Sequence, residues 1–198
     1  VNNSEFLTGA NISVTLTDDF MKAVELEGDH ALRFPAVESY SSEEMAIYND
    51  KWHEIGDVRE WEKQGHSVRT YRTMKAKDLW NLINICATYS AEPGIFFIDN
   101  ANEMTNAKAY GQQVVATNPC GEQPLAPYSV CNLAAVNLAQ FAQKDSKTVD
   151  FEGLKETVRV GVRMQDNVID ATPYFLEENE VQARGERRVG LGVMGLAD

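Results

Sequence analysis

Glu92-Pro93-Gly94-Ile95-Phe96-Phe97-Ile98-Asp99 is the stretch that decides the fold class of this chain. Its Pro-Gly pair is a helix stop signal, and the apolar run that follows predicts a fully buried strand over residues 95–99. The residues before it, 75–89, place apolar side chains three and four positions apart, which predicts an amphipathic helix. A helix that leads directly into a buried strand is typical of α/β proteins with a parallel sheet.

The same alternation of strand and helix signals continues on both sides of that stretch. Residues 11–17 alternate apolar and polar side chains and include β-branched residues, which predicts a strand. Asp18 and Asp19 follow it and are expected to cap a short helix. Further helices are expected at 149–171, capped by Asp150, and at 176–182, with strands at 129–138 and around Val189. The sequence therefore predicts an α/β fold with at least part of a parallel sheet.

Composition narrows the classes of function. The chain has 198 residues, with 18 Lys and Arg against 30 Asp and Glu, and a formal net charge of -12. Because nucleic-acid binding needs clustered basic side chains, we expect no binding of DNA or RNA. The sequence holds no run of about 18 apolar residues that would cross a membrane. Cys86, Cys120 and Cys131 are too few for a secreted disulfide framework, so a reducing cytoplasm is expected.

The histidines and the end of the chain add two expectations. His30, His53 and His66 are separated by 23 and 13 residues, which is no spacing of metal ligands, so we expect no metal site.

The chain ends in an apolar run punctuated by glycines, residues 189–198, whereas natural carboxyl termini are usually polar. We therefore expect the sequence to be a fragment, incomplete at both ends.

The candidate for chemistry is the segment 117–125. Asn118, Cys120 and Glu122 stand at positions i, i+2 and i+4, and in extended backbone this spacing projects all three side chains to the same side. Such an arrangement presents an amide, a thiol and a carboxylate to one small volume. It would supply hydrogen-bonding groups, a sulfur centre and an acid or base.

The neighbouring residues favour a rigid loop. Pro119 and Pro124 favour extended backbone, and Gly121 lets a ligand approach the backbone beside the thiol. Because a nearby carboxylate disfavours a thiolate, a neutral thiol or a sulfur radical fits the site better. The alternative is a Pro-Cys-Gly turn with a buried cysteine and a solvated glutamate. Cys86 and Cys131 have the same alternative, a small apolar side chain in the core.

A family resemblance favours the reactive loop over the turn with a buried cysteine. The segment Asn118–Leu125, followed by Cys131-Asn132-Leu133 and Val136-Asn137-Leu138, resembles the catalytic loop of ribonucleoside-diphosphate reductases. It is most similar to that of the adenosylcobalamin-dependent, class II enzymes. Three further stretches resemble the same family in the same order, namely 11–21, 92–99 and 187–198. One such motif would be weak, but four in order cover the chain from end to end.

The resemblance implies a fold and residue roles. The fold would be part of a ten-stranded α/β barrel whose catalytic cysteine lies on a finger loop. Cys120 would be the thiyl radical that takes the 3′ hydrogen of the ribose, and Glu122 would remove the proton of the 3′-hydroxyl. Asn118 would bind the sugar, with Pro119 and Gly121 completing the substrate-binding loop. Cys131 would be one half of the redox thiol pair, whose partner lies upstream of the matched region.

The resemblance also implies cofactors and partners. Adenosylcobalamin would start the radical, and thioredoxin or a similar dithiol would reset the cysteines. The substrate would be a ribonucleoside diphosphate or triphosphate, with dNTP or ATP effectors, in a monomer or a homodimer. The alternatives are a class I large subunit, which uses a separate radical-generating metal subunit, and a catalytically silent nucleotide-binding scaffold.

In domain terms, residues 1–198 would be a partial catalytic barrel domain, with 38–74 as a variable insertion that matches no family motif. Half of the redox pair and the loop that binds the substrate phosphates would lie outside the chain. We therefore expect these 198 residues alone to make no deoxynucleotide.

Overall fold

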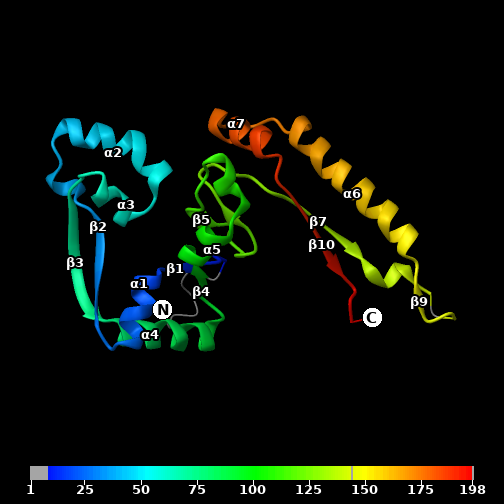
Figure 1. The fold of residues 1–198 in the computed structure, drawn as a ribbon, viewed down its shortest axis with the longest axis horizontal. Coiled ribbons are helices and arrows are strands. Elements are labelled where there is room, and N and C mark those ends of the chain that lie inside the picture. The colour runs from blue at the N-terminus through cyan, green and yellow to red at the C-terminus, as the bar shows by residue number, and fades with distance from the viewer. Residues whose placement is uncertain (1–8, 144, 198) are drawn as a thin grey trace. The chain divides into compact units, whose positions relative to one another are not determined.

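The computed structural model describes residues 9–143 and 145–197 (Figure 1). The chain divides into two compact units, Val1–Pro127 and Tyr128–Asp198, and each is described by itself. Within the described ranges the strands form five two-stranded sheets, two of them parallel. The expected α/β class with parallel strands is thereby confirmed, and closure into a barrel stays a prediction.

The first unit is built on a parallel pair of strands. β1 (Ser13–Leu16) pairs with β4 (Gly94–Phe97), and α1 (Asp18–Glu25) and α4 (Ala76–Ser90) lie in the connection between them. The core of this layer is apolar and nearly sealed from solvent, with Leu16, Phe20, Ala76 and Ile83 as its buried members. The predicted strand at 11–17 and the predicted helix at 75–89 are both confirmed.

Two local expectations are wrong. The strand predicted as fully buried at 95–99 is β4, and its Ile95 and Phe97 are 36% and 41% exposed. The reason is that β4 pairs only with β1 in the described residues, and α5 (Ile98–Met104) begins directly after it. The cap of α1 is Thr17, whose side chain accepts a hydrogen bond from Phe20 N, rather than Asp18 or Asp19.

A long antiparallel hairpin carries the segment that the sequence left unassigned. β2 (Asp29–Pro35) pairs with β3 (Val68–Lys75), and η1 (Val37–Ser39), α2 (Ser42–Ile55) and α3 (Val58–Lys63) lie between them. In Figure 1 these helices cover the end of the hairpin away from α1 and α4. We call residues 29–75 the hairpin module.

The hairpin module has an aromatic centre of its own. Trp61 is 0% exposed, and its Nε1 donates a hydrogen bond of 2.9 Å to Tyr40 Oη. The rings of Tyr48, Trp52 and His66 pack around it, with centroids 6.0, 5.6 and 3.9 Å away. This cluster gives α2 and α3 a surface to pack on at the far end of the two strands.

One arginine connects the hairpin module to the parallel layer. Arg59 Nη2 lies 2.8 Å from Asp57 Oδ2 and 2.7 Å from Asp99 Oδ1, and Asp99 Oδ2 also accepts a hydrogen bond from Asp18 N. The hydrogen bonds from Arg59 hold the pKa of Asp99 below its ordinary value. Asp99 therefore anchors both the start of α1 and the module.

This arrangement predicts a pH dependence of stability that weakens when the Arg59 guanidinium is removed. Because the folded-state pKa of Asp99 is depressed, its contribution to stability is present above the ordinary Asp pKa of about 3.9 and is lost as the pH falls through the lower value. Arg59→Met is expected to lower the melting temperature at about pH 7, and the difference from wild type should shrink below about pH 4. Melting curves over that range test it, with the exposed Arg159→Met as control. A difference that stays constant with pH would contradict the assignment.

The first unit ends in short elements. They are η2 (Asn106–Tyr110), β5 (Ala116–Thr117) and β6 (Pro124–Leu125), the last two forming a small antiparallel hairpin.

The second unit is a parallel pair covered by a long helix. β7 (Asn132–Asn137) pairs with β10 (Val189–Met194), and α6 (Phe151–Ala171) packs along both strands, as Figure 1 shows. Its remaining elements are η3 (Leu138–Phe141), β8 (Ala142–Gln143), β9 (Thr148–Val149) and α7 (Glu177–Glu186). The helix predicted at 149–171 and its Asp150 cap are confirmed, and the helix predicted at 176–182 extends to Glu186.

A buried amide ties the two strands of the second unit together. Gln165 is almost fully buried on α6, and its Nε2 donates 2.9 Å hydrogen bonds to Asn132 O and Gly190 O. Asn132 Nδ2 in turn donates to Gln165 O. The start of β7 and the start of β10 therefore share one hydrogen-bonding side chain.

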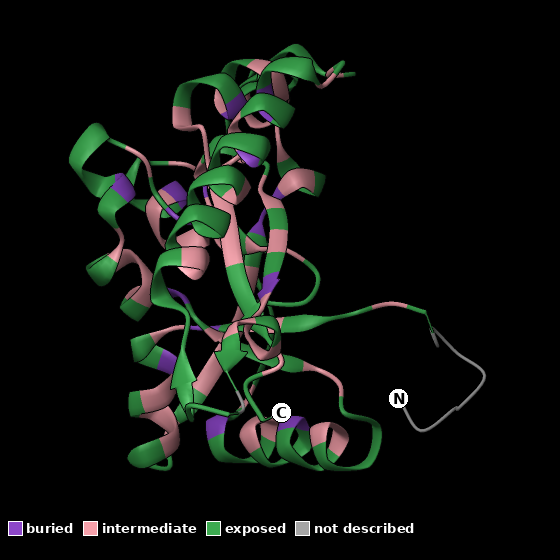
Figure 2. Cartoon of the chain, turned by 90° about the vertical axis from the view of Figure 1, so that its right-hand side faces the viewer, coloured by how far each residue is buried: buried purple, intermediate pink, exposed green. Residues whose placement is uncertain are grey.

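Few residues of the helices are buried. Figure 2 shows that they are largely exposed or intermediate, with buried residues as isolated bands. Among the described residues, none of the helices combines the length and the apolar character that crossing a membrane requires.

Candidate functional site

The hairpin of β5 and β6 encloses the segment that carries the candidate chemistry. Asn118 N donates to Gln123 O at 3.2 Å, and Gln123 N donates to Asn118 Oδ1 at 2.9 Å. These two bonds close residues 118–123 into a defined loop, which we call the Cys120 loop. Since the peptide N–H of Gln123 can only donate, it fixes the amide of Asn118 with its oxygen inward and leaves Nδ2 as a donor.

The backbone of the Cys120 loop is turned rather than extended. Gly121 N donates to Asn118 O at 3.0 Å, which makes residues 118–121 a β-turn with Pro119 at its second position. Gly121 has a φ of +83°, a conformation that glycine adopts without steric cost. The expected extended backbone is therefore wrong, because the turn hydrogen bond reverses the chain within these residues. The turn agrees with the alternative of a Pro-Cys-Gly turn.

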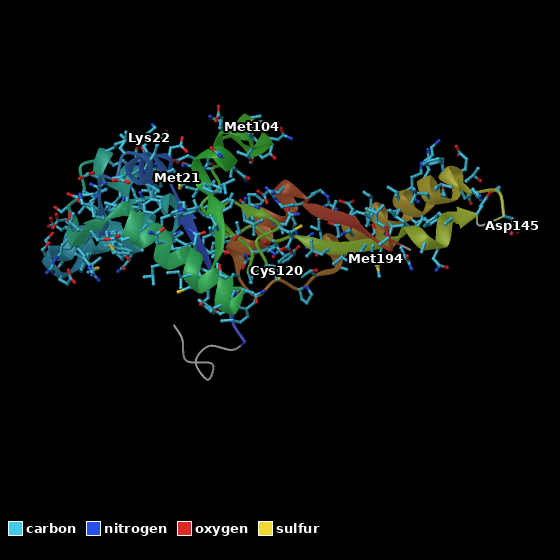
Figure 3. The ribbon with its side chains drawn as sticks, turned by 90° about the horizontal axis from the view of Figure 1, so that it is seen from below. Met21, Lys22, Met104, Cys120, Asp145 and Met194 are labelled. Atoms are coloured by element: carbon cyan, nitrogen blue, oxygen red, sulfur yellow. The ribbon has the colours of Figure 1, made fainter. Side chains whose placement is uncertain are left out.

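The thiol of Cys120 is exposed and has one hydrogen-bond partner in the described structure. Asn11 Nδ2 lies 3.3 Å from Cys120 Sγ and donates to it. Figure 3 labels this cysteine. The buried cysteine expected under the alternative of a Pro-Cys-Gly turn is therefore not found in the described structure, because Cys120 is exposed.

The residues around Asn11 are fixed by hydrogen bonds to the backbone of Ile12. Ile12 N donates to Glu92 Oε2 at 3.0 Å, and Ile12 O accepts from Gly94 N at 2.8 Å. A Cβ on Gly94 would lie 3.0 Å from Ser13 Oγ, so a larger residue at this position would require the Ser13 side chain to shift. A Cβ on Gly121 would lie 4.0 Å from the same oxygen, which places the Cys120 loop beside the start of β1.

Asn118, Cys120 and Glu122 thus lie in one closed six-residue loop. Asn118 is half-buried and offers an amide N–H, whereas Cys120 and Glu122 are exposed. An amide donor, a thiol and a carboxylate in one loop can bind a hydroxylated ligand, exchange a hydrogen atom at sulfur and accept a proton. Sequence reasoning found these three residues but missed Asn11, since no spacing relates two positions 109 residues apart.

The other cysteines lie elsewhere. Cys131 belongs to the second unit, directly before β7, where it is half-buried and donates to Asn132 O at 3.5 Å. Asn132 O is also bound by Gln165, so the carbonyl beside this thiol is held in place. Cys86 is half-buried on α4.

The described residues contain no metal-binding cluster, and a cavity of the first unit lies away from the Cys120 loop. In residues 9–143 and 145–197, no group of three or more His, Cys, Asp or Glu is placed to hold a metal ion. An open cavity of about 610 Å³ lies between β1, α1, β2 and α4, and its lining includes Leu16, Phe20 and Phe34 but none of residues 118–123.

Comparison with known proteins gives consistent matches. Residues 1–198 match the family described as ribonucleotide reductase, barrel domain. The vitamin B12-dependent ribonucleoside-diphosphate reductase of Thermoplasma acidophilum is 34% identical over 197 residues, covering 100% of this chain and 22% of that protein. The protein of the same name from Mycobacterium tuberculosis is 35% identical over 188 residues, with coverages of 95% and 22%.

A relative of another type is equally similar. The ribonucleoside-diphosphate reductase large chain of Cryptosporidium parvum is 36% identical over 190 residues, with coverages of 91% and 22%. The chain therefore spans about a fifth of the length of these relatives.

Proposed function

The chain belongs to the ribonucleotide reductase barrel-domain family, and from this we propose that the protein containing it reduces ribonucleotides to 2′-deoxyribonucleotides for DNA precursor synthesis. The observation that carries the proposal is the Cys120 loop. It holds a thiol, an amide donor and a carboxylate within six residues, closed by hydrogen bonds at both ends.

Each residue of the loop has a role in this reaction. A radical at Cys120 Sγ takes the 3′ hydrogen of the ribose, so that an S–H bond forms as the C–H bond breaks. Glu122 accepts the proton of the 3′-hydroxyl, and the 2′-hydroxyl takes up a proton from a thiol of the redox pair and leaves as water. Cys120 then returns its hydrogen atom to the 3′ carbon. Asn118 Nδ2 donates to the sugar, and Pro119 and Gly121 shape the turn against which it lies.

The closed loop suits this chemistry because hydrogen-atom transfer depends steeply on position. Holding the reacting atoms in a near-attack arrangement lowers the barrier, and a misplacement of about 1 Å can cost about 10²-fold. The turn at Asn118–Gly121 and the pairing of Asn118 with Gln123 restrict where Cys120 Sγ can lie.

Cys131 would supply half of the reducing equivalents. Two thiols that close to a disulfide release the two electrons the reduction needs, and a thioredoxin-type dithiol would reopen that disulfide by exchange. The position of Cys131 before β7, with its neighbouring carbonyl held by Gln165, supports a fixed location for this thiol in the second unit.

Adenosylcobalamin is the proposed source of the radical, because two similar relatives are named as vitamin B12-dependent. When bound, this cofactor supplies a carbon-centred radical that can take a hydrogen atom from a thiol. The chain fits this role at one atom, the exposed Cys120 Sγ.

One observation favours a second candidate. The similarity to the large chain from Cryptosporidium parvum supports a class I large subunit, whose radical comes from a separate metal-containing subunit. The loop residues would then act as described, with only the radical source changed. A catalytically silent scaffold is disfavoured, because Asn118, Cys120 and Glu122 are all present.

The proposal extends to the whole protein. β1, β4, β7 and β10 would be strands of a ten-stranded barrel with the Cys120 loop as its finger loop, and 38–74 would be a variable insertion. The substrate would be a ribonucleoside diphosphate or triphosphate, with dNTP or ATP effectors, in a cytoplasmic monomer or homodimer. Residues 1–198 alone would be inactive, because the second redox cysteine and the phosphate loop would lie outside them.

The test uses the full-length protein with CDP and CTP as substrates and dithiothreitol as reductant, with and without adenosylcobalamin. We expect deoxycytidine nucleotide to form only when the cofactor is present. Activity that instead requires a second protein would assign the chain to class I. Absence of reduction under either condition would contradict the proposed function.

A further inference from the structure

We propose that Asn11 is a positioning residue that orients the thiol of Cys120 through the hydrogen bond from its Nδ2 to Sγ. The inference rests on the proposed function and adds a residue to its site. Asn11 comes from the segment before β1, and no loop residue makes an equivalent contact with the sulfur in the described structure.

Asn11 is held independently of the Cys120 loop. Its neighbour Ile12 is bound on both sides of its peptide, by Glu92 Oε2 at its N–H and by Gly94 N at its carbonyl. Ser13 follows in register with Gly94 on the parallel strand β4. The amide of Asn11 therefore projects from a backbone segment whose position the sheet determines.

The sulfur is thus located by two elements far apart in sequence. The turn at Asn118–Gly121 sets the backbone of Cys120, and Asn11 sets the direction of its sulfur from β1. A divalent sulfur is a weak acceptor, and a donor at one lone pair restricts the rotation of the Cα–Cβ bond that carries it. A substrate that excludes water from the loop would strengthen this contact.

If Asn11 positions the thiol, its removal should slow the reaction without changing the fold, whereas a structural role predicts a loss of stability. Asn11 and Cys120 are both exposed, and the bonds that close the loop are made by Asn118, Gly121 and Gln123. Removing the amide of Asn11 leaves those bonds intact, so the fold should change little. Hydrogen-atom transfer should slow, because a freed sulfur samples positions out of reach of the 3′ carbon.

The experiment compares three substitutions at Asn11 in the full-length protein. Asn11→Asp keeps the shape but has no N–H, Asn11→Ala removes the group, and Asn11→Gln keeps a donor on a longer side chain. We expect kcat to fall about 10- to 100-fold in the Asp and Ala variants, with little change in KM, and to recover in part in the Gln variant. The isotope effect with 3′-deuterated substrate should rise as hydrogen transfer limits turnover.

The matched control is Asn84→Asp on α4, where an exposed amide donates to Trp80 O. It introduces the same charge and is expected to leave kcat and the isotope effect unchanged. Melting curves of every variant separate a loss of fold from a loss of positioning. An Asn11→Ala protein that melts like wild type and keeps its kcat would overturn the inference.

The outcome also separates this inference from the proposed function. Wild-type protein that reduces no ribonucleotide would remove both. Wild type that is active, together with Asn11 variants of equal kcat and isotope effect, would remove the role of Asn11 alone. A lower kcat that follows a lower melting temperature in both Asn11→Asp and Asn11→Ala would show a structural role and also overturn it.

Discussion

Replacing Cys120 by serine in the full-length protein is expected to lower deoxyribonucleotide formation by more than about 10³-fold. Serine keeps the size of the side chain and can accept the hydrogen bond from Asn11, so the Cys120 loop should still fold. The hydroxyl cannot take over the reaction, because breaking an O–H bond to form an oxygen radical costs much more energy than breaking an S–H bond to form a sulfur radical. Substrate binding, measured by equilibrium dialysis, should be nearly unchanged.

The matched control is the same substitution at Cys86. This cysteine is half-buried on α4, outside the Cys120 loop, and has no proposed role. Cys86→Ser is expected to retain most of the wild-type turnover. If Cys120→Ser also retained it, the radical would have to reside elsewhere, and the assignment of the loop would fail.

The largest expected effect on stability lies in the hairpin module. Trp61→Ala would remove its fully buried centre and the hydrogen bond to Tyr40, and truncations of this kind cost about 3–5 kcal/mol. The rings of Tyr48, Trp52 and His66 would lose their common contact surface. Amide hydrogen exchange should increase sharply in α2 and α3 and little in α6, which belongs to the second unit.

Two comparisons make that result specific. Tyr89→Ala truncates an aromatic side chain that is 80% exposed, so it should leave exchange in α2 and α3 unchanged. Trp61→Phe keeps most of the apolar volume and loses the indole N–H, so a smaller effect of about 1–2 kcal/mol is expected. Equal exchange in Trp61→Ala and Tyr89→Ala would show that the cluster does not support the module.

The parts of the fold predicted from sequence are those with local signals. Apolar spacing located α4 and α6, and the alternating pattern at 11–17 located β1. The hairpin module escaped prediction because Trp61 gathers partners at irregular intervals along the chain. The burial of β4 was wrong because an apolar run does not say how many strands will lie beside it.

The candidate site likewise has features that the sequence predicted and features that it did not. Residue types and family resemblance identified Asn118, Cys120 and Glu122, which the structure places in one loop. The turned backbone was foreseen only as the alternative of a Pro-Cys-Gly turn, because proline is compatible with both extended strands and β-turns. The hydrogen bond from Gly121 to Asn118 decides between them. Asn11 was missed because its contact depends on tertiary structure alone.

The close approach of Ser13 and Gly94 has a consequence for evolution. A methyl group at position 94 would stand 3.0 Å from the hydroxyl oxygen of Ser13, nearer than carbon and oxygen atoms ordinarily lie. The two positions face each other across β1 and β4, so a larger residue at position 94 requires the side chain at position 13 to shift or to become smaller. Among descendants of this sequence, a residue larger than glycine at position 94 should be accompanied by a residue at position 13 that lacks the hydroxyl or turns it away.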